Sequence, residues 1–312
     1  MVPDCRGPTG RVSESGARVS QAGTGVGRDA ARSAFKALPD SVQREVLRQW
    51  YRYGPRSYGE TREAHPLAEG MAVGNPDFVG IGVPKAGTTW WFSLVAAHPD
   101  IYVEHQKELM YFNQRVFDHC AQDGGADDVF EAYRQWFPRP EGTKTGEWTP
   151  NYLYAHELPS LLRKVAPACK VMVLLRDPVE RYRSHVSIRL SPGRMRIHRL
   201  LALDRGYYSA ALQPWERVFS PSEMLVLQFE ACRRSPEAHL GATYRFLGVD
   251  DSFVPDDLRL PVNKTAGKRP LPPDVERVLA RLYEADVLAL ADRYPQIDLN
   301  LWPNFAHLAG RS

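Results

Sequence analysis

Cysteine is sparse in this 312-residue sequence, and its few cysteines lie far apart. There is no Cys-x-x-Cys pair and no Cys/His cluster, so neither a zinc site nor a disulfide framework is indicated. Reduced thiols are the simplest interpretation, and they favour a cytoplasmic location. The cysteines are Cys5, Cys120, Cys169 and Cys232.

Long apolar runs and a large charge excess are also missing. No run is long enough to span a bilayer, and the first residues lack the apolar core of a signal peptide, so we expect no transmembrane segment. The formal net charge of +3 is too small to indicate a nucleic-acid partner. With 43% hydrophobic and 25% charged residues, the composition is that of a globular protein with a sizeable core.

Order is expected to begin late in the chain. Residues 1–28 are rich in Gly, Ser, Thr and Arg, with almost no large apolar residue, which predicts a disordered tail. In residues 29–75, apolar positions at helical spacing predict a helix that ends at Gly54, followed by a polar linker. The main domain is predicted to occupy residues 76–312.

From residue 76 onward, apolar runs alternate with amphipathic segments. The short apolar run FVGIGV (78–83) is typical of a strand buried on both faces. Such alternation predicts an α/β domain with a parallel sheet between helices, in which ligands bind beyond the carboxyl ends of the strands. Further strands are expected within 170–175 and 224–230, and helices within 88–99, 127–137, 178–186, 235–248 and 272–294.

The turn PKAGTT (84–89) joins the first strand to its helix and has the composition of an anion site. N–H groups at a helix start and the helix dipole favour an anion, and Lys85 adds a positive charge. Gly87 lets the backbone approach closely, and Thr88 and Thr89 supply hydroxyls. Because Lys85 precedes Gly87, this is not the triphosphate loop G-x-x-x-x-G-K-[ST]. The alternative is an ordinary glycine turn with a solvated lysine and a capping threonine.

A second polar strand end lies at Arg176. Asp177 has the position of a helix N-cap, with Glu180 placed to complete a capping box. Ser184 follows about two turns into that helix, so Arg176 and Ser184 would meet at a second phosphate if the helix folds back over the strand end. The alternative is an arginine paired with Asp177 or Glu180 and a serine that faces solvent.

A basic loop precedes the last helix. The segment VNKTAGKRPLPP (262–273) has no apolar periodicity and gathers Lys264, Lys268 and Arg269 around a glycine. It is either a flap over an anionic ligand or a solvated connector.

Taken together and in order, these segments resemble the sulfotransferases that use 3′-phosphoadenosine 5′-phosphosulfate (PAPS), especially the branch of the heparan-sulfate sulfotransferases and their bacterial relatives. The resemblance runs from about Asp77 to Trp302. It implies a P-loop-like three-layer domain, PAPS as co-substrate, no metal, and transfer of a sulfuryl group to an acceptor hydroxyl. The segments are PKAGTTW, GEWTPNYLY, LLRDPVERYRSH, Gly-Tyr-Tyr at 206–208, RFLG and NKTAGKRPLP.

The resemblance also implies roles for single residues. The first turn would hold the 5′-phosphosulfate, and Lys85 would stabilise charge on the leaving oxygen. Arg176 and Ser184 would bind the 3′-phosphate, and the basic loop would close over the donor. The implied donor-binding residues are Lys85, Ala86, Gly87, Thr88, Thr89, Trp90, Arg176, Ser184, Lys264, Lys268 and Arg269.

The family's general base is a glutamate a few residues before an aromatic pair, and Glu108 stands before Tyr111 and Phe112. A carboxylate in this position would take the proton of the acceptor hydroxyl. The alternatives are that Glu108 only pairs with Lys107 or a nearby arginine, or that His105 is the base.

One departure concerns the acceptor. Polysaccharide-modifying members often have a lysine after the glutamate of GEWTPNYLY, where this chain has Trp148. A tryptophan there suits a smaller or more aromatic acceptor, or it packs in the wall of the site. Trp91 is expected in the core rather than beneath the adenine. The acceptor side is expected to involve Tyr152 and residues 191–208, whose Arg194, Arg196 and Arg199 meet an anionic acceptor or face water.

The predicted function is therefore sulfuryl transfer to a sugar, a glycolipid or a small natural product. A P-loop nucleotide or small-molecule kinase is the alternative, but the triphosphate loop and a clear magnesium-binding aspartate are both missing. An inactive binding protein of the same fold is disfavoured because Lys85, Glu108, Arg176 and Ser184 are all present.

Overall fold

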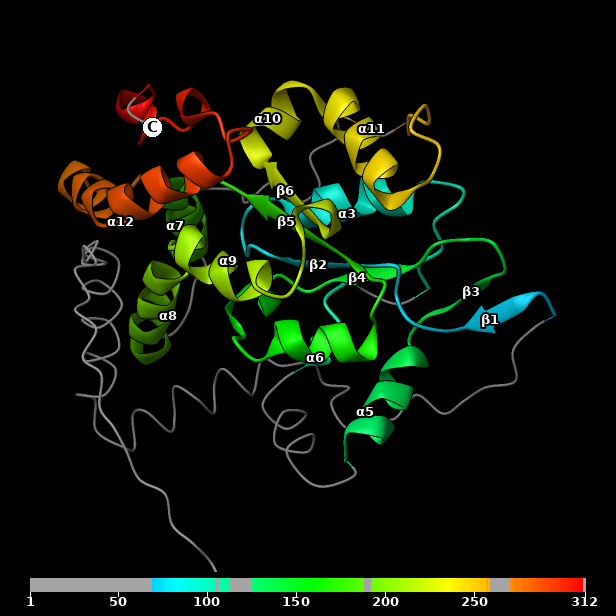
Figure 1. Cartoon of the computed structure of the whole chain (residues 1–312). Helices are drawn as coiled ribbons and strands as arrows, with labels where there is room; N and C mark the ends of the chain where they lie inside the picture. Colours follow the sequence, from blue (N-terminus) through cyan, green and yellow to red (C-terminus); the bar gives the residue numbers. More distant parts are fainter. Residues whose placement is uncertain are drawn as a thin grey trace, which may run out of the picture.

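A parallel sheet forms the centre of the protein, seen here in a computed structural model (Figure 1). Its four strands have the order β4-β2-β5-β6, with every neighbouring pair parallel. The strands are β2 (Phe78–Gly82), β4 (Gly146–Trp148), β5 (Lys170–Leu175) and β6 (Met224–Gln228). The structure describes residues 69–104, 107–112, 125–187, 192–256, 258 and 270–310.

Several predictions fall outside these described residues. They include the tail at 1–28, the helix predicted before Gly54, and the rival base His105. The basic loop residues Lys264, Lys268 and Arg269 also lie outside. All of these stay predictions.

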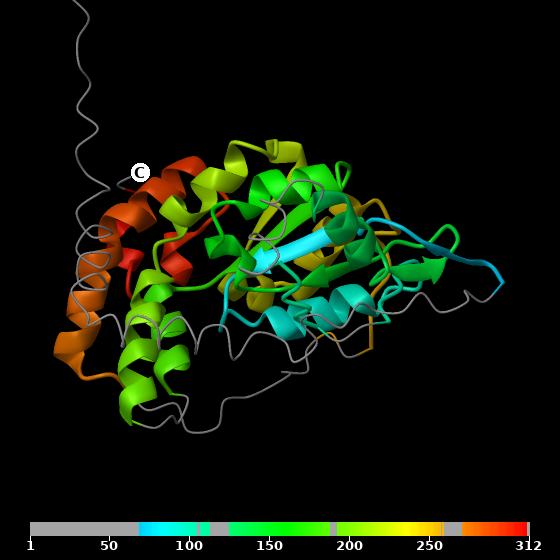
Figure 2. The ribbon, with the colours of Figure 1, turned by 90° about the horizontal axis from the view of Figure 1, so that it is seen from below.

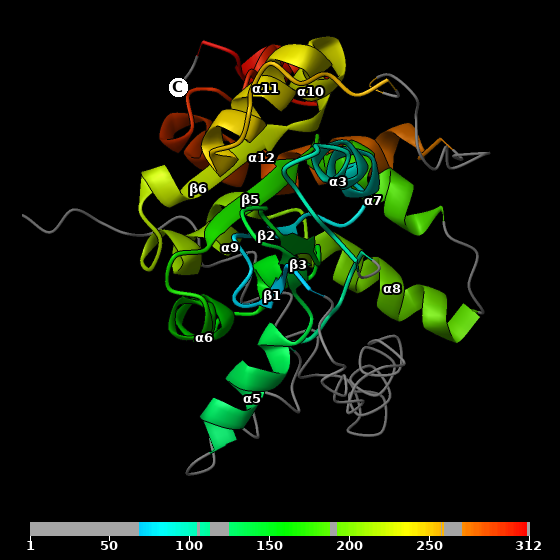
Figure 3. The ribbon, with the colours of Figure 1, turned by 90° about the vertical axis from the view of Figure 1, so that its right-hand side faces the viewer.

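Helices cover both faces of the sheet, which confirms the predicted three-layer α/β fold. Figure 3 shows α3 and α11 on one side of the strands and α6 on the other. Figures 1 and 2 place α8 and α12 together at one end, far from the short strands β1 and β3. The helices are α3 (Thr88–Ala96), α5 (Gly125–Arg134), α6 (Leu158–Val165), α7 (Pro178–Val186), α8 (Pro192–Asp204), α9 (Tyr208–Glu216), α10 (Phe229–Arg234), α11 (Pro236–Leu247) and α12 (Pro273–Arg293), with 3₁₀ turns η1 (Tyr152–Tyr154), η2 (Pro221–Glu223), η3 (Leu299–Leu301) and η4 (Ala306–Leu308).

A small antiparallel pair lies beside the main sheet. Strand β1 (Met71–Val73) pairs with β3 (Pro138–Pro140), with Ala72 opposite Arg139. Because β1 falls within the segment predicted to be a linker, regular structure begins before residue 76. Three residues carry too little periodicity for this strand to be recognised without its partner.

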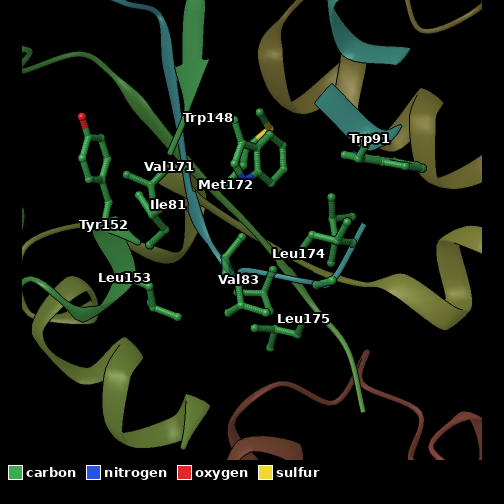
Figure 4. Close-up of a cluster of buried hydrophobic side chains, with 14 of the residues drawn as sticks. Ile81, Val83, Trp91, Trp148, Tyr152, Leu153, Val171, Met172, Leu174 and Leu175 are labelled. Atoms are coloured by element: carbon green, nitrogen blue, oxygen red, sulfur yellow. The ribbon is translucent and has the colours of Figure 1, made fainter. Parts of the chain in front are cut away.

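Trp148 belongs to the hydrophobic core. Its side chain is fully buried, and its indole Nε1 donates to the carbonyl of Gly82 at 3.2 Å. A Cβ on Gly80 would lie 2.0 Å from the indole, so this glycine makes room for the ring. Figure 4 shows Trp148 beside Met172 in the buried cluster, together with Trp91, whose side chain is also fully buried as predicted. Of the two possibilities considered for Trp148, its burial favours packing over contact with an acceptor.

The start of α7 follows the predicted cap only in part. Asp177 accepts from the N–H groups of Val179 at 2.9 Å and Glu180 at 3.2 Å. The Glu180 side chain does not reach back to close a capping box. Instead, the N–H of Asp177 donates to Glu230 of α10 at 3.3 Å. This contact fixes the strand end at Arg176 against the end of β6.

Candidate functional site

The turn between β2 and α3 leaves a helix start open to an anion. Gly87 is the N-cap residue of α3, in the left-handed conformation at φ 88°, and no side chain in the described part of the chain caps the helix. The first intrahelical bond runs from the Trp91 N–H to the Gly87 carbonyl. The N–H groups that precede it have no partner within the helix, so they are available to phosphate oxygens.

Gly87 is required by a neighbour as well as by its conformation. A Cβ at this position would lie 2.5 Å from the Phe229 ring. Phe229 starts α10 and also contacts Trp90 edge-on, with ring centroids 6.1 Å apart. Phe229, which directly follows β6, thus packs against the turn. Sequence analysis missed this contact.

Arg176 joins the two predicted phosphate motifs. From the carboxyl end of β5, its Nη1 donates to the carbonyl of Lys85 at 3.1 Å. Its guanidinium lies over the Phe229 ring, 5.1 Å from the centroid. Both motifs therefore meet at the carboxyl edge of adjacent strands, where ligands bind in such sheets.

Arg176 also pairs with Glu180, as the alternative interpretation expected, but this pairing leaves one N–H group of the guanidinium without a partner among the described residues. Nη2 lies 3.5 Å from Glu180, which also pairs with Arg183. The buried Nε of Arg176 has no hydrogen-bond partner among the described residues. Burial lowers the pKa of Arg176, and the carboxylates of Glu230 and Glu180 raise it. An additional anion would satisfy this desolvated cation.

Ser184 does not face solvent. It lies on α7 with 3% of its surface exposed, which excludes the solvated-serine alternative.

Lys85 and Glu108 lie close enough to influence each other. Burial lowers the pKa of the Lys85 ammonium, the Glu108 carboxylate raises it, and the Arg176 charge lowers it. Glu108 also accepts a hydrogen bond from Lys107 Nζ at 2.7 Å, so the pairing considered as an alternative exists. The Glu108 side chain remains 42% exposed. A partly exposed carboxylate beside the anion turn retains access to an acceptor hydroxyl.

The two residues predicted to be catalytic share an unusual backbone conformation. Lys85 has φ 72° and Glu108 has φ 69°, and Met110 follows with φ 48°. Among the described residues, these three are the non-glycine residues with positive φ. Such strain costs of order 1 kcal/mol or more each and persists only where the surroundings hold the backbone.

A buried carboxylate missed by sequence analysis lies behind the Glu108 segment. Glu147, at the centre of β4, is fully buried and accepts from Tyr133 OH at 2.6 Å and Thr149 Oγ1 at 2.7 Å. Tyr152 OH donates to the same carboxylate at 3.3 Å. Burial raises the pKa of Glu147 to about 7, and the three hydroxyl hydrogen bonds act against this rise. The segment GEWTPNYLY shows only a glutamate with hydroxyl residues close after it, a pattern that does not by itself specify burial.

Asp177 is not free to hold a metal. One of its oxygens accepts the two helix N–H groups, and the other accepts from the backbone N–H and side-chain amide of Asn304 at 3.1 and 2.9 Å. Within the described ranges, no three His, Cys, Asp or Glu side chains gather as metal ligands. The prediction that activity needs no metal stays a prediction.

The sequence matches a known family over most of this site. A family model described as the sulfotransferase domain matches residues 75–265. The chain therefore belongs to the sulfotransferase family, a family of transferases that use PAPS, and the kinase alternative is not favoured. The predicted family resemblance is confirmed.

Individual proteins with similar sequences are also sulfotransferases. The human heparan sulfate glucosamine 3-O-sulfotransferase 6 is 29% identical over 201 residues, which cover 59% of this chain and 56% of that protein. The human bifunctional heparan sulfate N-deacetylase/N-sulfotransferase 3 is 25% identical over 198 residues, 56% of this chain and 22% of that protein. The chain thus spans less than two thirds of the length of these curated relatives.

A solved structure shares the fold. The crystal structure of a sulfotransferase from Alicyclobacillus acidocaldarius superimposes with a TM-score of 0.55 at 23% identity. The match covers 74% of this chain and 99% of that one. In the part of the chain that the structure describes, we find no helix both long and apolar enough to cross a membrane.

Proposed function

We propose that this protein transfers a sulfuryl group from PAPS to a hydroxyl group of an acceptor. The observation that carries the proposal is the contact between Arg176 and the carbonyl of Lys85. It joins two anion-binding features at one sheet edge, as a donor with phosphates at both its 3′ and 5′ positions requires.

The residues present suit this donor. The uncapped start of α3, with Lys85, would hold the 5′-phosphate and its attached sulfuryl group. Arg176, with its unpartnered Nε, and Ser184 would hold the 3′-phosphate. PAPS supplies the activated sulfuryl group. The basic loop with Lys264, Lys268 and Arg269 would complete the proposed donor site.

Glu108 and Lys85 would divide the chemistry between them. The Glu108 carboxylate removes the proton from the acceptor hydroxyl as the oxygen attacks. The Lys85 ammonium stabilises the negative charge that develops on the departing 5′-phosphate oxygen. The influence of Glu108 on the pKa of Lys85 supports placing both beside the same reacting groups.

The names of the relatives point to more than one kind of acceptor atom. One relative is named for 3-O-sulfation and another for N-sulfation, so the relatives do not fix the acceptor atom. The burial of Trp148 removes the argument for an aromatic acceptor. Arg199 is exposed on α8, whereas Arg194 and Arg196 have undescribed side chains. A panel of sugars, glycolipids, glucosamine-containing polymers and small natural products, read by mass spectrometry for an added sulfo group, would find the acceptor.

A thermal-shift comparison tests the donor class without an acceptor. We expect 3′-phosphoadenosine 5′-phosphate (PAP) to raise the melting temperature in the presence of a chelator, because binding to the native state stabilises it. ADP with magnesium should give a much smaller shift. The reverse order would contradict the proposal and favour a kinase.

A further inference from the structure

We infer that Glu147 is a positioning residue that holds the segment 107–112, and with it Glu108, through two hydroxyl relays. The inference rests on the proposed role of Glu108 as the base. Glu147 itself is fully buried in β4, and its carboxylate accepts hydrogen bonds from Tyr133, Thr149 and Tyr152.

Each relay passes from the carboxylate through a hydroxyl to a backbone N–H. Thr149 Oγ1 donates to Glu147 at 2.7 Å and accepts from the N–H of Met110 at 3.1 Å. Tyr152 OH donates to Glu147 at 3.3 Å and accepts from the N–H of Phe112 at 3.3 Å. The two relays therefore hold the chain two and four residues beyond Glu108.

The direction of the hydrogen bonds in both relays requires that the group at position 147 accepts hydrogen bonds and donates none. A hydroxyl has one proton, so it can accept from a backbone N–H in this geometry while giving that proton to the carboxylate. An ionised carboxylate can receive all the donors that converge on it, which come from Thr149, Tyr152 and Tyr133. A glutamine at position 147 keeps the size but presents an NH₂ group, which would oppose one of these hydroxyls.

The held segment needs such support because its backbone is strained. Glu108 and Met110 both have positive φ values, at 69° and 48°. Residues in this region persist only when their surroundings fix them. Without the relays, the segment would relax and Glu108 would leave its position beside Lys85.

The described residues around Glu147 include no cation that competes for its carboxylate. Among the described residues, no lysine, arginine or histidine forms an ion pair with it. The titratable groups that face it are the Tyr133 hydroxyl of α5, the Tyr152 hydroxyl of η1 and the Cys169 thiol before β5. The hydrogen bonds that the Glu147 carboxylate accepts from described side chains thus come from hydroxyl groups.

Amide hydrogen exchange of peptides covering 107–112 tests the inference without any acceptor or turnover. In Glu147→Gln, Thr149→Val and Tyr152→Phe, we expect exchange at Met110 or Phe112 to be about tenfold faster, the effect of losing one hydrogen bond. Tyr133→Phe is the matched control, because it also removes a hydroxyl bonded to Glu147. Among the described residues, that hydroxyl accepts from no backbone N–H. Exchange of this variant in 107–112 should match that of the native protein.

Two further readouts separate positioning from general damage. The relay variants should bind PAP as tightly as the native protein by calorimetry, while single-turnover sulfation falls by about 10- to 100-fold. If Glu147→Gln fails to fold, Thr149→Val and Tyr152→Phe carry the test, because both keep the carboxylate. Unchanged exchange in these two variants, or equal acceleration in Tyr133→Phe, would overturn the inference. Failure of PAP to bind the native protein would instead contradict the proposed function and leave the exchange result valid.

Discussion

At the scale of single residues, the proposed chemistry depends on two side chains of opposite charge. Lys85 follows β2, and Glu108 lies on a separate segment after α3, yet the Glu108 carboxylate acts on the pKa of Lys85. Both have strained backbones. Their proximity allows one to act on the acceptor and the other on the donor.

Substitutions should separate these two roles. Glu108→Gln keeps the size of the side chain but cannot accept a proton, so turnover should fall about 10²- to 10⁴-fold while PAP affinity survives. Lys85→Ala should lower both turnover and PAP affinity, because the ammonium also contacts the 5′-phosphate. Calorimetry and single-turnover sulfation measure the two quantities.

Lys107→Met is the control for the ion pair between Lys107 and Glu108. It should retain much more activity than Glu108→Gln, because the proposed base is still present. Near-native turnover in Glu108→Gln would remove Glu108 from the mechanism, and His105 would be tested next.

Glu147 should impose a pH dependence on stability. Burial raises its pKa to about 7 in the folded protein from the usual 4.5 of a glutamate. Between these values the native state holds a proton that the unfolded state has lost, so the free energy of unfolding falls as the pH rises, by about 1.4 kcal/mol per pH unit at most. Ionised Glu147 thus costs stability while it supplies the acceptor oxygens of the relays.

The measurement is denaturant unfolding of the native protein and Glu147→Gln from pH 5 to pH 8. The difference between them should shift in favour of the variant as the pH rises. Glu230, whose pKa burial also raises to about 7, is present in both proteins and cancels in this difference. A difference that does not change with pH would show that Glu147 is already ionised at pH 5.

At the scale of elements, the turn before α3 combines a left-handed glycine with an aromatic support. Gly87→Ala should weaken PAP binding, because a Cβ in contact with Phe229 displaces the turn. Gly142→Ala is the matched control, since Gly142 also has positive φ but a Cβ there would meet no atom of the described residues within 4 Å. Both variants should lose of order 1 kcal/mol of stability from backbone strain.

Calorimetric titration with PAP distinguishes the two glycine variants. Only Gly87→Ala should show reduced affinity. Equal affinities in both variants would mean that the position of this turn does not determine nucleotide binding.

The elements that sequence analysis predicted are those with strong local signals. The segment 170–186 gave β5 and α7 correctly, because an apolar run is followed by an Asp-Pro helix start. Strand β4 was missed because its three residues, GEW, become a strand only by pairing with β2. Helix α9 was not predicted, and one reason is that Pro214 lies within it.

The residues of the candidate site also fall into those that local sequence signals predicted and those that they did not. Lys85 and Arg176 stand in recognisable motifs, and their meeting follows from the sheet topology. The part played by Glu147 depends on hydroxyls from α5 and η1 and on a segment far away in sequence. No local pattern specifies that a carboxylate will be buried among such partners.

At the scale of the whole molecule, the order of the strands creates the proposed donor site. Strands β2 and β5 are neighbours in the middle of the sheet, so the turns that follow them lie side by side (Figure 1). Phe229, after β6, supports both Gly87 and Arg176. Three adjacent parallel strands thus contribute to the proposed anion-binding edge.

The measurement that tests this account most directly is the affinity of the native protein for PAP and for AMP, which lacks the 3′-phosphate. We predict tighter binding of PAP by roughly 10- to 100-fold, the effect of a charge-assisted contact. Arg176→Ala should largely remove this preference. Arg183→Ala, which deletes another arginine paired with Glu180, should keep it. Equal affinities for PAP and AMP in the native protein would contradict the assignment of PAPS as donor.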